Sequence, residues 1–419
     1  MSTINYAKMQ SKAWYGDERI TLRFPEGWEV NTVTPQDAPK LTAAEIEEAL
    51  SLPIGTPRIS EIAAGRKNAV IVVDDLSRPT PVAEIIPFLL RELRDIPKDE
   101  IRFVVGGGSH RALTPEEIAK KVGANIAREY QVTCHDFMSG DLRGFGNLPS
   151  GMPIYINRVV ADADLKICLG GIYPHGSVGF GGGAKLIVPG VAGFATMFYF
   201  HTFCPSRGHA VIERQSGNPD HRDAAEAVAG ILGLDVIVNV VINSKREVAG
   251  VFVGDYVKAH RMGAKLALET YGTKIPKKIS QETDLLVLNC YPLDSDPIQT
   301  TKALWAKNHF TNNYTVAINP ACDGICYHGL FDQVDYARFV DQKSSQEPMA
   351  FIEPKIHSAD QLLVCSEHFP VNDFYKKHSS DLLFRQWSTL VEALAEKLPE
   401  NPKVAVFPCA GIQVPAQEN

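Results

Sequence analysis

The stretch that decides the fold is Ala69-Val-Ile-Val-Val-Asp-Asp-Leu-Ser-Arg-Pro-Thr-Pro81, followed by the segment Val82 to Leu93. Its first five residues are apolar and mostly β-branched, which is typical of a buried strand. A polar loop stiffened by prolines comes next, and the last segment has apolar residues at helical spacing. The stretch therefore predicts a strand, a loop and a helix, in that order.

The same order recurs through the first half of the chain. Ile101 to Val105 leads into Gly106 to Arg111, the run around Val132 leads into His135-Asp136, and Leu165 to Leu169 leads into a glycine-rich segment. This repetition predicts an α/β fold with mainly parallel strands. Loops that leave the carboxyl ends of such strands meet on one side of the sheet, so we treat their polar residues as one candidate site.

Further along, the pattern predicts two strands within Val236 to Phe252, a helix over Tyr256 to Tyr271, and a linker over 272–278. We therefore expect two α/β domains, comprising residues 1–272 and 273–419. The elements expected in the second are strands at Leu285 to Leu288, Thr315 to Ile318, Leu362 to Val364 and Val404 to Phe407, and helices at Ile298 to Trp305 and Trp387 to Leu398.

Composition narrows the class of partner. The 419 residues carry a net charge of −7, so there is no general basic surface for nucleic acid or an anionic membrane. No apolar run approaches the length of a membrane-spanning helix, and the first residues lack a signal-peptide core. We expect a cytoplasmic protein whose partner is a small molecule.

The eight cysteines are scattered and do not suggest a disulfide framework. Cys322-Asp-Gly-Ile-Cys326-Tyr-His328 contains possible metal ligands. A structural zinc site needs a second ligand pair at matched spacing, and the sequence does not supply one. The pattern therefore gives this segment no assigned role.

The segment Pro174 to Gly190 combines six glycines with His175 and Lys185. Glycines let a backbone approach a ligand closely and offer N–H groups to an anion, and a lysine adds charge or a nucleophile. Glycines alone would equally suit a turn between core elements. A P-loop is excluded because Leu follows Lys185 where Ser or Thr is required, and a dinucleotide fingerprint fits only weakly.

Two other loops carry candidate residues. Arg78 follows a strand and could hold a carboxylate or phosphate by two contacts, or form a structural ion pair with Asp74 or Asp75. His110 follows three glycines, and a lone histidine there would suit a structural role. Together with His175, it makes acid–base chemistry more plausible. The residues themselves thus indicate an α/β enzyme for an anionic ligand and leave its reaction open.

At this point the sequence resembles the nickel-pincer nucleotide-dependent lactate racemase family. The glycine-lysine segment and a histidine sixteen residues after the lysine carry most of the resemblance. The matching residues are Asp74 to Pro81, Gly108 to Arg111, Pro174 to Gly190, His201, and Gln299 to Lys302.

The resemblance implies a cofactor-binding N-terminal domain, a C-terminal domain that contributes substrate-binding residues, and an active-site cleft between them. It implies a cofactor derived from nicotinic acid mononucleotide, with two sulfur donors and one carbon donor around nickel, and enzymes that build it as transient partners. Lys185 would carry this nickel-pincer nucleotide through a thioamide, and His201 would be the remaining nickel ligand. The resemblance places Asp75, Ser77 and Ser177 near the cofactor.

The resemblance also implies the reaction, which is racemisation of a 2-hydroxy acid by reversible hydride transfer. His110 and His175 would be paired acid/base groups, and Arg78, Gln299 and Lys302 would hold the carboxylate and hydroxyl of the substrate. Removing the α-hydrogen as hydride avoids the dianion that proton abstraction beside a carboxylate would create. Return of hydride to the opposite face of the planar 2-oxo acid gives the other enantiomer, which requires two bases.

Two departures from the family pattern bear on the substrate. Ile298 stands where the lactate enzymes are expected to have an aromatic residue, and Asp373-Phe374-Tyr375-Lys376 stands in place of an expected Asp-Gln-Trp-Gln. An apolar wall at Ile298, with Phe374 or Tyr375 nearby, favours short-chain aliphatic 2-hydroxy acids such as lactate and 2-hydroxybutyrate. The alternatives are a larger substrate (a sugar acid, malate or an aryl-lactate) and a non-catalytic protein that binds the nickel cofactor.

Overall fold

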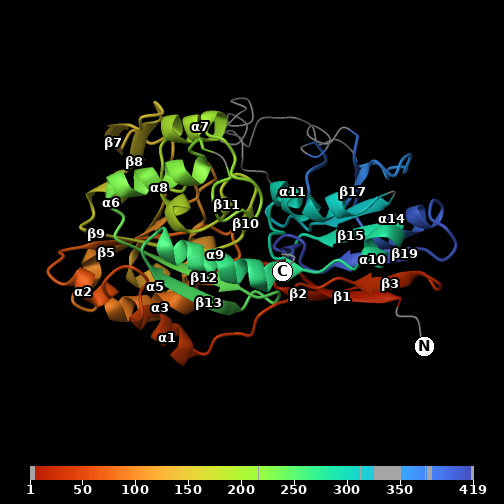
Figure 1. The fold of residues 1–419 in the computed structure, drawn as a ribbon, viewed down its shortest axis with the longest axis horizontal. Helices are drawn as coiled ribbons and strands as arrows, with labels where there is room; N and C mark the ends of the chain where they lie inside the picture. Colours follow the sequence, from red (N-terminus) through yellow and green to blue (C-terminus); the bar gives the residue numbers. More distant parts are fainter. Residues whose placement is uncertain are drawn as a thin grey trace. The chain divides into compact units, whose positions relative to one another are not determined.

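The computed structural model describes residues 5–215, 217–311, 313–324, 351–372, 374 and 380–416. They form two compact units, and Figure 1 gives the element labels used below. Unit 2 is the described part of Ala38–Leu268, and unit 1 contains the residues up to Asp37 together with those from Glu269 onward.

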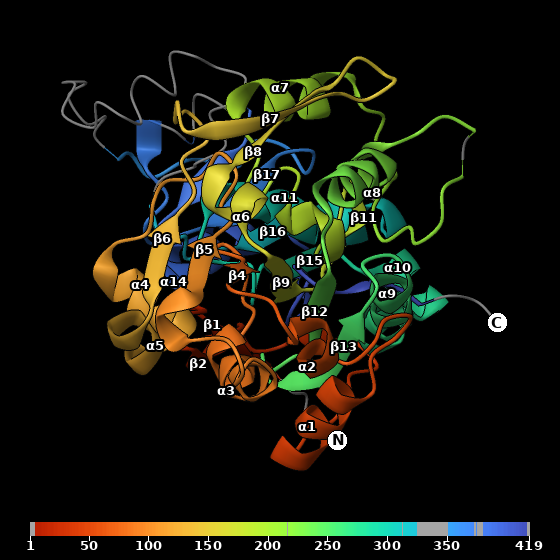
Figure 2. The ribbon, with the colours of Figure 1, turned by 90° about the vertical axis from the view of Figure 1, so that its left-hand side faces the viewer.

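Unit 2 is built on a six-stranded sheet in the order β13-β12-β9-β4-β5-β6. β13 pairs antiparallel with β12, and the other neighbours pair in parallel, which confirms the predicted α/β class. Figure 2 shows these strands side by side. Their bounds are β4 Ala69–Val73, β5 Ile101–Val105, β6 Gln131–Cys134, β9 Leu165–Gly171, β12 Val236–Ile242 and β13 Val248–Gly254.

Helices cover both faces of this sheet, with α1 and α3 on one side and α6 and α8 on the other (Figure 1). α3 buries Val82, Ile85 and Leu89, the stripe that its helical spacing predicts. The helices are α1 Ala43–Ser51, α2 Ile59–Ala63, α3 Val82–Glu92, α4 Pro115–Val122, α5 Ala124–Glu129, α6 Arg158–Asp162, α7 Phe194–Phe203, α8 His221–Leu232 and α9 Lys258–Tyr271, with short 3-10 turns η1 Lys98–Glu100 and η2 Gly183–Leu186. Two small hairpins pair β7 Leu142–Asn147 with β8 Pro153–Asn157, and β10 Pro174–His175 with β11 Gly179–Phe180.

Unit 1 contains a second six-stranded sheet, in the order β18-β17-β16-β15-β19-β3, with every neighbouring pair parallel. Its apolar side chains form cores on both sheet faces. The strands are β3 Glu29–Thr32, β15 Leu285–Asn289, β16 Tyr314–Ile318, β17 Leu362–Cys365, β18 Leu382–Phe384 and β19 Lys403–Phe407. The remaining elements are β1 Tyr6–Ser11, β2 Glu18–Arg23, β14 Gly272–Thr273, β20 Val414–Pro415, α10 Lys277–Glu282, η3 Pro297–Gln299, α11 Thr300–Ala303, η4 Leu304–His309 and α14 Trp387–Ala395.

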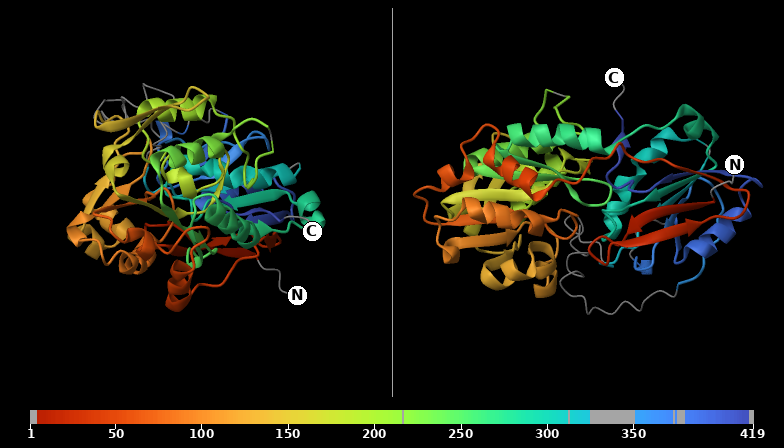
Figure 3. Two further views of the ribbon diagram at one scale, coloured as in Figure 1. Left: turned by 60° about the vertical axis from the view of Figure 1, so that its left-hand side comes forward. Right: turned by 90° about the horizontal axis from the view of Figure 1, so that it is seen from below.

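The predicted division into 1–272 and 273–419 is wrong at its amino-terminal end. The second boundary lies near Leu268, close to the prediction, but the first 37 residues belong to unit 1. The reason is that β3 pairs with β19, and the β1–β2 hairpin contributes Met9 and Leu22 to the unit 1 core. Figure 3 shows these red strands among the blue elements of the carboxyl-terminal part.

The expected linker 272–278 contains secondary structure, because β14 pairs with β20 and α10 begins at Lys277. In the part of the chain that the structure describes, no helix is both long and apolar enough to cross a membrane.

Candidate active site

The loop after β4 is fixed from beneath by a buried ion pair. Asp74 accepts hydrogen bonds from Thr80 Oγ1 at 2.5 Å and from the Gly171 amide at 3.0 Å, and lies 2.6 Å from Lys121 Nζ. Lys121 is fully buried and also donates to the backbone carbonyls of Arg78 and Thr80, each at 3.1 Å. Asp74 therefore serves the loop's structure, and the loop presents Arg78 to a pocket above the sheet.

Asp75, the next residue in the loop, contacts His110 instead of Lys121. Its Oδ2 lies 2.5 Å from His110 Nδ1, and its Oδ1 accepts from Ser77 Oγ at 2.5 Å. Burial alone would raise the pKa of Asp75, but the His110 imidazole, together with Arg78 and Ser77, outweighs it and holds that pKa well below its usual range. An ionised Asp75 keeps the proton of neutral His110 on Nδ1, so Nε2 is the basic nitrogen.

His175 lies in the β10–β11 hairpin, at the start of the glycine-rich segment. Its Nδ1 accepts a hydrogen bond from the Ser177 backbone N–H at 3.1 Å. In the neutral ring, the proton therefore lies on Nε2. The two histidines thus differ, because neutral His110 has an acceptor at Nε2 where neutral His175 has a donor.

The glycine loop is held from behind by buried polar side chains. Arg222 Nη1 donates to the Gly182 carbonyl at 3.1 Å, and its Nη2 donates to that of Phe180. His260 Nε2 donates to the Gly181 carbonyl at 2.8 Å. Burial lowers the pKa of His260 well below its usual value, so the ring is neutral at neutral pH. The loop carbonyls are thus hydrogen-bonded to Arg222 and His260, neither of which lines the pocket.

Gly182 shows why glycine is needed in this loop. Its φ is +73°, and a Cβ there would lie 3.0 Å from the Gly171 carbonyl oxygen. Directly after it, η2 contains Lys185, whose side chain is partly exposed and lines the pocket.

His201 is on α7, near the helix end. Its Nδ1 donates to the Met197 carbonyl at 2.9 Å, which leaves the ring lone pair on Nε2. Burial lowers its pKa to about 4, and His221 and Lys185 add to this effect. A neutral imidazole is the form that binds a metal.

These side chains line one pocket at the carboxyl ends of β4, β5 and β9. The structure thus brings together, within unit 2, all the site residues predicted there. The predicted residues that line it are Asp75, Ser77, Arg78, His110, His175, Ser177, Lys185 and His201.

The other predicted residues, Ile298, Gln299 and Lys302, belong to unit 1, on η3 and α11 after β15. Gln299 is 1 % exposed, and within the described ranges its buried Oε1 has no hydrogen-bond partner. A buried amide oxygen of this kind is costly unless a ligand donates to it.

One sequence expectation ends differently, and others are not tested. Phe374 is fully buried and packs against Phe369 with ring centroids 5.2 Å apart, so it is a core residue rather than part of a substrate wall. Asp373, Tyr375 and Lys376 lie outside the described residues, as do Cys326 and His328. The described ranges contain no group of three or more His, Cys, Asp or Glu side chains that could hold a metal.

The supporting residues Lys121, Arg222 and His260 were not predicted. Each is a polar residue within a helix whose neighbours follow an ordinary amphipathic pattern. The contacts by which they support the loops reach residues 40 or more positions away in sequence, so no local signal marks them.

The fold and pocket define an α/β protein of two units, with a ligand pocket at strand carboxyl ends lined by histidines, an arginine and a glycine-loop lysine. Residues 15–211 match the sequence model of a protein family, the lactate racemase N-terminal domain. The lactate racemase of Lactiplantibacillus plantarum is 34% identical over 314 residues, which cover 72% of this chain and 73% of the relative. That of Thermoanaerobacterium thermosaccharolyticum is 32% identical over 314 residues, covering 73% and 70%. The chain belongs to the lactate racemase family, and it is an isomerase of the racemase class.

Solved structures agree on the fold. The lactate racemase apoprotein from Thermoanaerobacterium thermosaccharolyticum superposes with a TM-score of 0.69 at 23% identity, covering 98% of this chain and 100% of that one. A protein from Thermotoga maritima gives a TM-score of 0.58 at 16% identity, covering 89% and 98%.

Proposed function

We propose that this protein racemises short-chain aliphatic 2-hydroxy acids, such as lactate and 2-hydroxybutyrate, by reversible hydride transfer to a nickel-pincer nucleotide. The observation that carries the proposal is the pocket of unit 2. It gathers a cation for a carboxylate, Arg78, two histidines for proton transfer, His110 and His175, and two residues suited to hold a cofactor, Lys185 and His201.

The residues present fit such a cofactor. Gly181 and Gly182 line the pocket, so a nucleotide bound there would meet backbone rather than side chains. His201 offers a neutral Nε2 to nickel, and Lys185 offers an amine for the thioamide. A metal needs donors besides His201, which the carbon and sulfur atoms of the pincer would provide. When bound, the cofactor would accept a hydride from the substrate and return it.

The chain's own residues would bind the acid and move its hydroxyl proton. Arg78 would hold the carboxylate by charge-assisted hydrogen bonds. As hydride leaves C2, His110 would take the hydroxyl proton at Nε2, and Asp75 would stabilise the ring's positive charge. When hydride returns to the opposite face, His175 would share its Nε2 proton with the oxygen through a hydrogen bond as negative charge develops there, and the proton taken by His110 would return through solvent to complete the hydroxyl.

The residues of unit 1 would complete substrate binding under this proposal. Gln299 would hold the hydroxyl oxygen through its amide N–H, which leaves the hydroxyl proton for His110, and Lys302 would add a second cation for the carboxylate. Ile298, which is partly buried on η3, would set the preference for small hydrocarbon substituents.

The test uses protein produced together with the cofactor-building enzymes. Peptide mass analysis should find a nucleotide-derived adduct on Lys185, with nickel near one per chain, and Lys185→Ala should lose both. His110→Gln and His175→Gln should retain nickel and lose racemisation. If both histidine variants racemise lactate like the parent, the acid–base assignment is wrong.

A substrate panel separates the remaining alternatives. Lactate and 2-hydroxybutyrate should be racemised much faster than malate, gluconate or an aryl-lactate. Faster turnover of any of the larger acids would overturn the proposed substrate class. A fully loaded protein that racemises none of them would favour the non-catalytic cofactor-binding alternative.

A further inference from the structure

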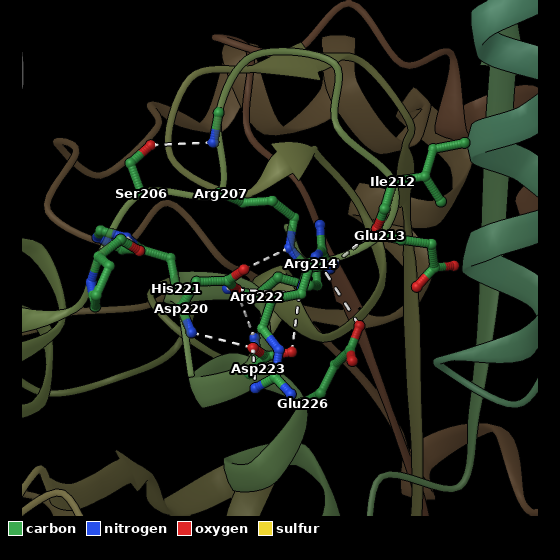
Figure 4. Close-up of polar contacts among 12 residues, drawn as sticks. Ser206, Arg207, Ile212, Glu213, Arg214, Asp220, His221, Arg222, Asp223 and Glu226 are labelled. Carbon is green, nitrogen blue, oxygen red and sulfur yellow. Dashed lines mark hydrogen bonds and ion pairs between the residues drawn. The ribbon is translucent and has the colours of Figure 1, made fainter. Parts of the chain in front are cut away.

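A buried charge cluster lies behind the glycine-rich segment and does not line the pocket. At its centre is Arg207, whose side chain is only 1% exposed. Its Nε and Nη2 donate to the two oxygens of Asp220 at 2.7 and 3.1 Å, and Nη2 also donates to Asp223 Oδ1 at 2.8 Å (Figure 4). The mechanism proposed above does not use these three residues.

The two carboxylates also begin α8. Asp220 is the N-cap residue and accepts from the backbone N–H of Arg222 and Asp223, while Asp223 accepts from the Asp220 N–H at 3.0 Å. Burial opposes the charge of Asp220, but Arg207 and the backbone donors keep its pKa below the usual value. Arg207 is therefore tied to the fixed end of a twelve-residue helix.

The backbone beside Arg207 holds the turn that follows His175. The Arg207 N–H donates to the Ser177 carbonyl at 2.7 Å, and Ser206 Oγ donates to the Gly176 carbonyl at 2.6 Å. A Cβ at Gly179, whose φ is +74°, would lie 1.8 Å from the Val211 carbonyl oxygen. Only glycine allows the turn to come this close to the segment that Arg207 anchors.

The same turn contacts the catalytic ring. The Ser177 carbonyl accepts a hydrogen bond from the Arg207 backbone N–H, and the Ser177 N–H donates to His175 Nδ1. A continuous set of contacts thus runs from the two carboxylates through Arg207 and Ser177 to His175. Because the amide occupies Nδ1, a substrate can contact the ring only through the Nε2–H.

We infer that Arg207 is a positioning residue for His175, because its ion pairs with Asp220 and Asp223 fix the turn whose Ser177 amide orients the ring and places its proton on Nε2. The inference rests on the proposed function only in giving His175 a role in proton transfer. The geometric part can be tested without cofactor or substrate.

The first experiment is nitrogen NMR of the cofactor-free protein carrying ¹⁵N-labelled histidine, with His175→Gln identifying the His175 signals. Wild-type protein should show Nδ1 unprotonated and Nε2 protonated. Arg207→Gln should give a mixture of tautomers. Arg214→Gln is the matched control, because Arg214 contacts the same Asp223 at 3.4 Å from a side chain that is 40% exposed, and it should leave the His175 signals unchanged.

Unchanged His175 signals in a folded Arg207→Gln protein would overturn the inference. If that variant does not fold, Ser206→Ala replaces it, since Ser206 is exposed and its hydroxyl donates to the Gly176 carbonyl and accepts from the Gly208 N–H. This milder change should also shift the His175 signals, and its failure to do so would count against the inference equally.

Loaded enzyme gives an independent readout. Loss of alignment at the reacting group should lower kcat of Arg207→Gln by roughly 10 to 100-fold with KM little changed, and Arg207→Lys should recover part of the loss. Equal loss in the Arg214 control would indicate a general effect on stability and contradict the inference. If His175→Gln stays active, the proposed function fails, while the NMR result still decides the role of Arg207.

Discussion

Replacing Asp75 by Asn is the sharpest test of how this pocket works. The side chain keeps its size, and an amide can still accept from Ser77, whose Oγ lies 2.5 Å from Asp75 Oδ1. The change removes the carboxylate that holds His110 Nδ1 at 2.5 Å. An Asn amide can donate to Nδ1, which would move the ring proton to Nε2 and take away the base.

The expected loss is large. The same change in a carboxylate–histidine pair of a hydrolase lowers kcat by about 10⁴-fold, because the wrong tautomer is favoured. Here Ser77 Oγ lies 3.4 Å from His110 Nδ1 and can accept a hydrogen bond from the Nδ1–H when the carboxylate is absent. We therefore expect a fall on the order of 10³-fold in kcat for lactate racemisation, at full cofactor occupancy.

The assay follows conversion of each lactate enantiomer with a stereospecific detection enzyme, while nickel and the Lys185 adduct are quantified in the same sample. Ser77→Ala is the matched control, because it keeps the Asp75–His110 contact and should lose far less activity. An Asp75→Asn enzyme that is fully loaded and keeps kcat within about threefold of wild type would refute the assignment of His110 as a base oriented by Asp75.

Three further changes test the support of the site. Lys121→Met should lower the free energy of unfolding by about 3 to 5 kcal/mol, measured in urea, because it leaves Asp74 buried without its cation, and adding Asp74→Asn should recover part of the loss. A purely additive double variant would contradict this coupling. The pKa of His260 is lowered in the folded state, so the unfolded state binds more protons, and the free energy of unfolding should fall as the pH drops below 6.5. His260→Gln should make the free energy of unfolding depend less on pH in this range. An unchanged pH dependence in that variant would exclude His260 as its source. Gln299→Leu should raise KM for lactate without destabilising unit 1, because it removes a buried oxygen that has no partner in the described chain, and a marked loss of thermal stability would instead show a structural role.

The local patterns predicted the elements that form the pocket well. β4 covers Ala69–Val73 as expected, and the loops after it and after β5 carry Arg78 and His110. This worked because an apolar run followed by glycines or prolines specifies a strand and its end without reference to distant residues. The roles of individual site residues came from the resemblance to a family, and they stay predictions.

The patterns could not predict which distant residues pair. β3 lies beside β19, more than 370 positions later, so the amino-terminal residues belong to unit 1. Nothing in the four residues of β3 indicates that partner, because edge pairing depends on where the rest of the sheet places a free strand edge.

The sequence by itself determined the class of fold, the positions of the chemically active residues, and their gathering at strand carboxyl ends, because those depend on local periodicity and on the handedness of α/β units. Only the tertiary structure decided how each side chain is used. In the folded chain Asp74 pairs with Lys121 and Asp75 pairs with His110, although the two carboxylates are adjacent in sequence. Protonation and tautomer depend on burial and on partners a few ångströms away, and folding brings those partners from distant parts of the chain.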